Sequence, residues 1–247
     1  MTYCLAISVN QGLVFASDSR TNAGVDYVAT YSKMTRFVFE GNRTIVILTS
    51  GSLATSQAVL NRIKKDIHDA KSDFDISKGS HLHEVAEYIG AISQKEQNRH
   101  LAAMEKSKSS NESSFIVGGQ ITGGECEIFL VYPQGNFISA SPDTPYLQIG
   151  ESKYGKPILD RFIEQRTGLE DAARCAVISL DSTIRSNISV GPPIEIAIHQ
   201  ADKIEDPYHN VLNASSTIYQ SIQKQWNKGL KLAFARLPRF DWEKPTK

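Results

Sequence analysis

The sequence predicts an α+β fold in which two antiparallel sheets stack and helices cover both outer faces. Segments with strand character occur in runs, and segments with helical periodicity separate these runs. Short turn sequences join the strands within a run, which is typical of antiparallel pairing. This alternation of strand runs and helix pairs favours layered sheets between helices over a doubly wound parallel sheet.

The first part of the chain predicts a β-hairpin. Between residues 3 and 9, large apolar side chains alternate with smaller or polar ones, which is the period-2 pattern of a half-buried strand. Asn10-Gln11-Gly12 is a turn sequence, because asparagine and glycine tolerate positive φ angles. Residues 13–17 predict the second strand of the hairpin.

The pairing of this hairpin determines which side chains meet near the N-terminus. If Val9 faces Leu13, then Asp18 faces Cys4. Thr2 is then the diagonal neighbour of Asp18, at a backbone spacing of roughly 7–8 Å that long side chains can span. The hairpin therefore brings a hydroxyl group and a carboxylate together by local geometry alone.

The same periodicities predict the rest of the chain. Ser52 is placed to cap a helix, and Thr167-Gly168-Leu169-Glu170 has the pattern of a capping box. In chain order, we expect a loop with short extended pieces over residues 20–31, strands over 34–40 and 43–49, helices over 53–70 and 82–106, strands over 114–121 and 126–132, short strands within 137–148, a helix after Gly150, a helix over 169–184, a strand over 194–198 and a long helix over 215–236.

Composition and charge exclude several classes of protein. The 247 residues carry 27 basic and 27 acidic side chains, so the chain has no electrostatic attraction for nucleic acid or an anionic membrane. No apolar run approaches the ~18 residues of a membrane span, and no secretory signal is expected. The three cysteines are far apart and odd in number, as expected of reduced residues in a cytoplasmic protein.

We expect a single domain over residues 1–247, with a C-terminal helical extension over about residues 215–247. The six histidines have no metal-ligand spacing, and no nucleotide-binding glycine motif occurs. Neither a metal nor a cofactor is therefore expected.

Thr2 is a candidate nucleophile because it would become the N-terminal residue once Met1 is removed. Met1 precedes a small side chain, which is the usual condition for its removal. Thr2 would then carry a free α-amine with an ordinary pKa of about 7.7–8.0. A base with that pKa is well matched to accepting a proton from a hydroxyl group, and a threonine activated by its own amine is a known nucleophile.

The motifs around Thr2 resemble those of a known family. Thr2, Asp18-Ser19-Arg20, Lys33 and Ser50-Gly51 have the order and approximate spacing of proteasome β-type subunits, which are N-terminal-nucleophile hydrolases with an αββα sandwich. The segments 1–4, 12–26 and 187–194 are similar, more narrowly, to the bacterial ancestral β-subunit branch called Anbu.

The resemblance and the hairpin geometry together imply roles for four residues. Thr2 is the nucleophile and its α-amine is the base. Lys33 lies beside the hydroxyl, and its charge favours the deprotonated forms of both hydroxyl and amine. Asp18 pairs with Lys33 and orients it. The N–H of Gly51, at a strand-to-helix turn, is the expected oxyanion donor.

Three further residues are expected to bind substrate. Thr21 and Asn22 match the backbone segment with which an extended substrate pairs as an added strand in β subunits. Tyr31, in the stretch before Lys33, is expected to help form the first specificity pocket.

The residues that support the threonine in β subunits match less well. The family's Gly-Ser-Gly-Ser aligns with Gly150-Glu151-Ser152-Lys153, so only Ser152 can take a serine's place. The family's later Asp-x-x-Ser falls near Asn187 and Ser189, which are expected to hydrogen-bond the Thr2 amine. This uncharged surrounding predicts weak or narrowly selective peptidase activity.

Three functions fit the sequence. The first is a self-compartmentalising threonine peptidase that acts on peptides or unfolded proteins and associates with itself in a ring or an open helix. The second is an amidase of the same superfamily acting on a small substrate. The third is a catalytically silent assembly or binding subunit. The sequence does not indicate whether an ATPase is a partner.

Overall fold

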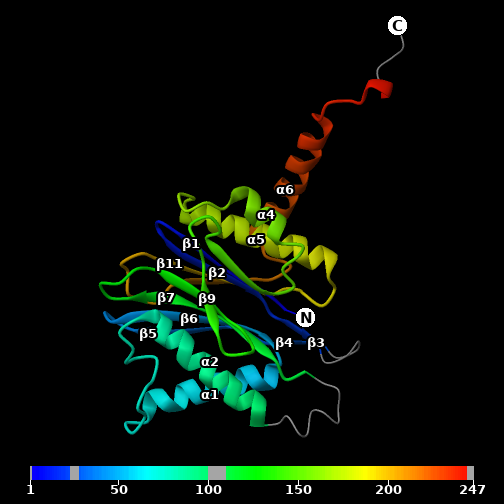
Figure 1. Cartoon of the computed structure of the whole chain (residues 1–247). Coiled ribbons are helices and arrows are strands. Elements are labelled where there is room, and N and C mark those ends of the chain that lie inside the picture. Colours follow the sequence, from blue (N-terminus) through cyan, green and yellow to red (C-terminus); the bar gives the residue numbers. More distant parts are fainter. Residues whose placement is uncertain (1, 23–27, 100–109, 244–247) are drawn as a thin grey trace.

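Two five-stranded antiparallel sheets stack face to face, and helices cover the outer face of each (Figure 1). The computed structural model describes residues 2–22, 28–99 and 110–243. The predicted α+β class, a four-layer αββα sandwich, is confirmed by this arrangement.

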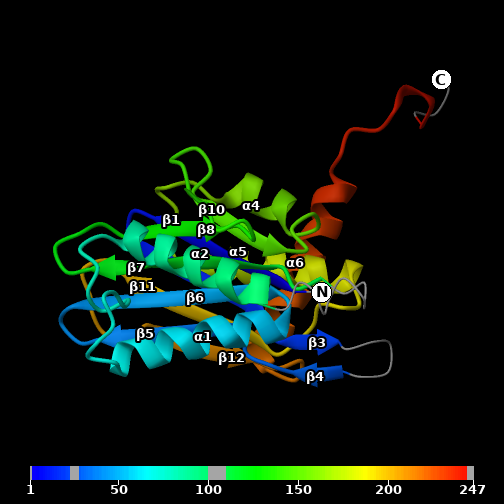
Figure 2. The same ribbon diagram turned by 60° about the horizontal axis from the view of Figure 1, so that its bottom comes forward.

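The first sheet combines strands from both ends of the chain. In spatial order its strands are β10 (Tyr146–Gly150), β1 (Tyr3–Val9), β2 (Gly12–Asp18), β11 (Ile194–Gln200) and β12 (Tyr208–Leu212). The second sheet keeps chain order, with strands β5 (Met34–Phe39), β6 (Arg43–Gly51), β7 (Ser113–Ile121), β8 (Glu127–Val131) and β9 (Phe137–Ser139). A separate hairpin of β3 (Arg20–Asn22) and β4 (Val28–Thr30) lies at the end of the sandwich near the N-terminus (Figure 2).

The helices form the outer layers. α4 (Lys156–Phe162) and α5 (Leu169–Ser186) cover the first sheet, and α1 (Leu53–His68) and α2 (Leu82–Arg99) cover the second (Figure 1). α6 (Thr217–Ala235) projects away from the sandwich and is followed by the short 3-10 helix η1 (Asp241–Glu243). None of the helices in the described ranges combines the length and the apolar character needed to cross a membrane.

Apolar side chains fill the spaces between these layers. Tyr3, Leu5 and Ile7 of β1 belong to the cluster between the first sheet and α5, whereas Cys4 and Ala6 face the second sheet. The strand is therefore buried on both faces, and the prediction of a half-buried strand is wrong. The alternation arises because the layer between the two sheets takes the smaller side chains of this strand.

The predicted N-terminal hairpin is present, but its register differs by one residue. Val9 pairs with Gly12, and Cys4 pairs with Ser17 instead of Asp18. The reason is a tighter turn, in which Gly12 is already part of β2. Gly12 has a φ of +139°, and a Cβ atom there would lie 2.1 Å from the carbonyl oxygen of His199, so only glycine fits against β11. The shift brings Asp18 one residue closer to Thr2.

The two predicted helix caps had different outcomes. Ser52 caps α1 as expected, because its side chain accepts a hydrogen bond from the backbone N–H of Thr55. The capping box at 167–170 is wrong: the N-cap of α5 is Gly168, and Thr167 bonds to the preceding loop. The side chain of Gln11, from the β1–β2 turn, accepts the N–H of Leu169 instead.

Two other elements differ from the prediction. β12 (Tyr208–Leu212) was not predicted, because this edge strand has no apolar alternation and is defined by its pairing with β11. α2 is described up to Arg99, and the part of the predicted helix over residues 100–106 lies outside the described residues.

Candidate active site

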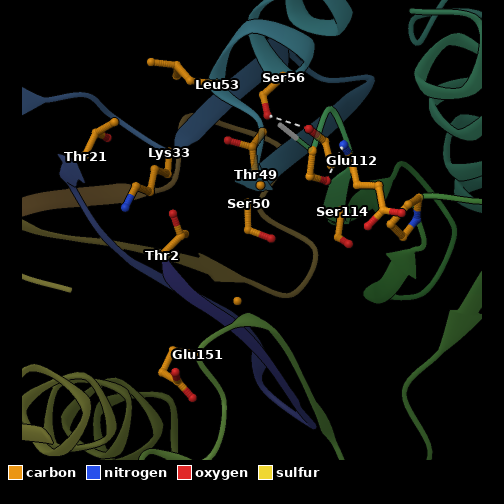
Figure 3. A pocket seen from close by; sticks show the side chains of 15 residues that line it. Thr2, Thr21, Lys33, Thr49, Ser50, Leu53, Ser56, Glu112, Ser114 and Glu151 are labelled. Carbon is orange, nitrogen blue, oxygen red and sulfur yellow. Dashed lines mark hydrogen bonds between the residues drawn. The ribbon is translucent and has the colours of Figure 1, made fainter. Parts of the chain in front are cut away.

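A cleft with a volume of about 440 Å³ opens where the N-terminus of β1 meets the ends of both sheets. Figure 3 shows side chains from several separate segments converging on it. The residues that line the cleft include four of those predicted from the sequence, namely Thr2, Thr21, Lys33 and Gly51. Hydroxyl and carboxylate groups make up most of the remaining polar lining, from Thr49, Ser50, Ser56, Ser113, Ser114, Glu112 and Glu151.

Thr2 is held in place by the end of β10. The N–H of Glu151 donates a 2.7 Å hydrogen bond to the carbonyl oxygen of Thr2. The preceding Gly150 has a φ of +82°, and a Cβ atom there would lie 2.0 Å from the same oxygen. Glycine is therefore required at this position, because any side chain would displace the backbone of Thr2.

Asp18 and Lys33 form a buried ion pair beside Thr2. The Lys33 Nζ donates to Asp18 Oδ1 at 2.7 Å and to the carbonyl oxygen of Arg20 at 2.7 Å. Asp18 is fully buried, and Lys33 is only 6% exposed. The N–H groups of Tyr3, at 2.9 Å, and Gly191, at 3.2 Å, also donate to the Asp18 carboxylate. These donors come from β1, the residue directly before β5 and the loop before β11, so the pair can form only in the folded chain.

The electrostatic environment of Asp18 has two opposing parts. Burial raises the pKa of its carboxyl group, because the charged form loses its hydration. The ammonium of Lys33 and the N–H donors of Tyr3 and Gly191 oppose this increase, and the pKa stays above its ordinary value.

Gly51 ends β6 one residue before the cap of α1. Its φ is +100°, and a Cβ atom at this position would lie 2.3 Å from the carbonyl oxygen of Glu112. Gly51 also pairs with Ser113 of β7, which aligns the cleft wall of β6 with that of β7. The N-terminal turn of α1 contributes Leu53 and Ser56 to the same wall. A helix N-terminus offers backbone donors and a positive dipole end to an oxyanion.

The predicted substrate-binding residues are separated by the structure. Thr21, in β3, lines the cleft. Asn22 follows it in the same strand, where its backbone alone is described. Tyr31 is 44% exposed and lies outside the lining of the cleft, and its N–H donates to the carbonyl oxygen of Ser19 at the base of the β3–β4 hairpin.

The predicted supporting residues also lie outside the lining of the cleft. The Nδ2 of Asn187 donates to Glu151 Oε2 at 3.0 Å, and its Oδ1 accepts the N–H of Ser189. The carbonyl oxygen of Ser152 accepts the N–H of Lys156 as α4 begins. Through these contacts Asn187 orients Glu151, the residue that aligns with the family's first serine.

Sequence reasoning missed the acidic lining of the cleft. Glu112, Ser113 and Ser114 reach it because β7 pairs with β6 in a register that places Ser113 opposite Gly51. The charged, serine-rich stretch before β7 gave no signal for this register. Glu151 had a signal, because it stands where the family has a serine.

A four-layer αββα sandwich with a cleft at the start of its first strand is the architecture of proteasome-type subunits. The sequence profile described as "Proteasome subunit" matches residues 2–199. The chain is similar to Anbu (ancestral beta-subunit) from Yersinia bercovieri, with 39% identity, full coverage of both chains and a TM-score of 0.91. The helical assembly of the Anbu complex from Pseudomonas aeruginosa is 42% identical, covering 97% of this chain and 98% of that one, with a TM-score of 0.92.

A third solved structure, Anbu from Hyphomicrobium sp. strain MC1, is 37% identical over 97% of this chain and 100% of that one, with a TM-score of 0.86. The search of curated proteins gave no match. The chain belongs to the proteasome subunit family and, within it, to the Anbu branch.

Proposed function

We propose that this chain is an N-terminal threonine peptidase, in which Thr2 is the nucleophile and its own α-amine is the base. The observation that carries the proposal is the buried Asp18–Lys33 ion pair, which opens onto the same cleft as Thr2. Thr2 and Lys33 held far apart would have favoured a silent subunit. Both line one cleft, which favours an active one.

The proposed reaction starts with removal of Met1. The Oγ1 of Thr2 attacks the carbonyl carbon of the scissile peptide bond, and the α-amine accepts the hydroxyl proton, directly or through one water molecule. The charge of Lys33 lowers the cost of forming the alkoxide. The N–H of Gly51 donates to the oxyanion of the tetrahedral intermediate. The protonated α-amine of Thr2 gives the proton to the leaving amine as the peptide C–N bond breaks. Water then hydrolyses the ester on Thr2.

The hairpin beside the cleft suggests how a substrate is aligned. β3 carries Thr21 into the lining and pairs only with β4 among the described strands. The backbone groups of Arg20 hydrogen-bond to Gly191 and Lys33, so the other edge of β3 is available to an added strand beyond Arg20. An extended peptide would bind there by backbone hydrogen bonds, as in other strand-addition modes. We infer that Thr21 and Asn22 supply this edge.

The proposal is tested with a peptide epoxyketone and a β-lactone, followed by intact mass and peptide mapping. We expect one adduct per chain, located on Thr2, and no adduct on a Thr2→Ala variant. A peptide library and a set of small amides then distinguish a peptidase from a small-substrate amidase. Absence of an adduct from a chain that begins at Thr2 would support a silent subunit.

The acid limb of the pH profile should have two stages. As the pH falls, the labelling rate first decreases with a slope of one on a logarithmic plot, because the α-amine of Thr2, with an ordinary pKa of about 7.7–8.0, takes up a proton. At a lower pH the slope should increase from one to two, because Asp18 also takes up a proton and releases Lys33. This change should occur at a pH above about 3.9, the ordinary pKa of an aspartate, because burial raises the pKa of Asp18.

The protonation of Asp18 that causes the second stage should not by itself lower the free energy of unfolding. A carboxyl group whose pKa is higher in the folded than in the unfolded state stabilises the fold as it becomes protonated, so this group contributes no acid unfolding in that window. Labelling rates and far-UV circular dichroism, measured on the same samples, check both statements. A single slope of one throughout would contradict the role of Asp18.

We also propose that copies of this chain associate with one another. The solved relative from Pseudomonas aeruginosa is described as a helical assembly, which supports association here. In this chain the hydroxyl of Tyr219, in the first turn of α6, donates to Asp181, and Trp226, in the middle of the helix, packs edge-on against Phe162. Further along, Phe234 is 77% exposed and Trp242 is 81% exposed, which is unusual for large apolar side chains of an isolated subunit.

A chain truncated after residue 229 should lose most of its self-association, because it lacks the exposed apolar side chains of the C-terminal segment, namely Leu230, Leu232, Phe234, Leu237, Phe240 and Trp242. Light scattering at micromolar concentration should report an oligomer for the full chain and a smaller species for the truncated one. A full chain that is monomeric by light scattering, and that forms neither a ring nor an open helix in microscopy, would contradict the proposal.

A further inference from the structure

A buried carboxylate that the proposed mechanism does not use lies close to the cleft. Glu195 is in β11, where Ile194 and Ile196 face the helix layer and Ala197 faces the second sheet. By alternation, Glu195 faces the layer between the two sheets, and it is only 7% exposed. A charge in such a layer costs free energy unless hydrogen bonds compensate for the lost hydration.

Two of the partners of this carboxylate, Ser19 and Ser32, lie at the two ends of one segment. The Oγ of Ser19 donates to Glu195 Oε1 at 3.2 Å, and the Oγ of Ser32 lies 3.0 Å from Glu195 Oε2. Ser32 Oγ is also 2.9 Å from the carbonyl oxygen of Met34, and the charged carboxylate is the stronger acceptor for its single proton. The Nε2 of His209, diagonally across on β12, is 3.3 Å from Oε2.

Ser19 and Ser32 mark the base of the β3–β4 hairpin. Ser19 directly follows Asp18 of the ion pair, and Ser32 directly precedes Lys33. At the same level, the N–H of Tyr31 donates 3.0 Å to the carbonyl oxygen of Ser19. One carboxylate therefore joins the point where the chain leaves the sandwich to the point where it returns.

We infer that Glu195 is a positioning residue, which fixes the base of the β3–β4 hairpin and thereby the strand edge that β3 offers to an extended substrate. Two oxygens of one rigid carboxylate hold two hydroxyl groups that are thirteen residues apart, so the hairpin cannot shift along the cleft without breaking a bond. Lys33 is less dependent on Glu195, because its ammonium is bound directly to Asp18. The part of the inference that concerns substrate rests on the proposed function.

The first test measures the hairpin without any catalysis. Amide hydrogen exchange is followed in the full chain and in Glu195→Ala, over residues 19–22 and 28–32. We expect faster exchange in these two segments and unchanged exchange in β6 and β7. Unchanged exchange at the hairpin base would overturn the inference, whether or not the protein proves to be a peptidase.

The second test compares an extended peptide epoxyketone with a small β-lactone. A displaced binding strand should slow labelling by the extended probe about tenfold or more, since small displacements of a bound substrate are costly to rate, while the small probe should react within about threefold of the wild-type rate. Glu195→Gln keeps one acceptor oxygen and should recover part of the loss. The double variant Ser19→Ala, Ser32→Ala should show the same loss in labelling by the extended probe as Glu195→Ala.

Asp66→Ala is the matched control for loss of a buried carboxylate. Asp66 lies in the last turn of α1, away from the cleft, and accepts hydrogen bonds from Arg62 at 2.7 Å and Tyr88 at 2.8 Å. We expect it to lower the melting temperature and leave the ratio of the two labelling rates unchanged. Equal losses of labelling rate with both probes in Glu195→Ala would contradict the positioning role and show that Glu195 only stabilises the fold. If wild type reacts with neither probe, the proposed function fails and the exchange experiment still decides the inference.

Discussion

Lys33→Ala should remove covalent labelling of Thr2 while leaving the protein folded. Without the ammonium, the deprotonated form of the Thr2 hydroxyl loses the positive charge of Lys33, and we expect the labelling rate to fall by at least about 10²-fold, as for loss of a group in general acid–base catalysis. The rate is measured by intact mass over time with the β-lactone, and folding by circular dichroism.

The same substitution should cost stability. Asp18 would lose its 2.7 Å partner while remaining fully buried, although it would keep the N–H donors of Tyr3 and Gly191. We expect a loss of about 1–3 kcal/mol in the free energy of unfolding, the range for a buried group left without a partner. Uptake of a proton by Asp18 would limit the loss, since burial already raises its pKa.

Lys78→Ala is the control that separates activation from stability. Lys78 also pairs with a nearly buried aspartate, Asp75, at 3.1 Å, but in the loop between α1 and α2. Lys78 is 46% exposed, so its loss should destabilise the protein less. Labelling should proceed at the wild-type rate. Wild-type labelling of Lys33→Ala would show instead that Lys33 has only a structural role.

The sequence was sufficient to predict the fold class because local patterns determine it. The alternation in β1 and the turn at residues 10–12 define a hairpin, and the apolar periodicity after Ser52 defines α1. The exact register was not predictable, because it depends on the contact between Gly12 and β11. Likewise, β12 exists only through its pairing with β11, and its own residues give no pattern.

The placement of candidate residues was predictable where each stands in a recognisable local motif, as for Thr2, Asp18, Lys33 and Gly51, which all lie in or beside the cleft. It was not predictable where long-range packing decides. Asn187 reaches Glu151, and Glu195 reaches both ends of the hairpin, across separations of 36, 176 and 163 residues.

The free α-amine of Thr2 is the second feature with a large expected effect. With Met1 retained, the nitrogen of Thr2 is part of a peptide bond, which cannot accept a proton, and the proposed base is missing. We expect no detectable acylation of Thr2 in such a chain, even with Asp18 and Lys33 in place. A chain with Thr2→Ser should retain activity once its N-terminus is free, because serine supplies the same hydroxyl group.

The decisive measurement compares two matched forms of the protein. Both carry the same leader before Thr2; in one a site-specific protease removes it to leave Thr2 at the N-terminus, and in the other the cleavage site is inactivated. Both are treated with the same β-lactone and the same peptides, and their masses are recorded. We predict an adduct on Thr2 and peptide hydrolysis with the processed form alone. Equal labelling and hydrolysis by the blocked form would contradict the N-terminal-nucleophile mechanism.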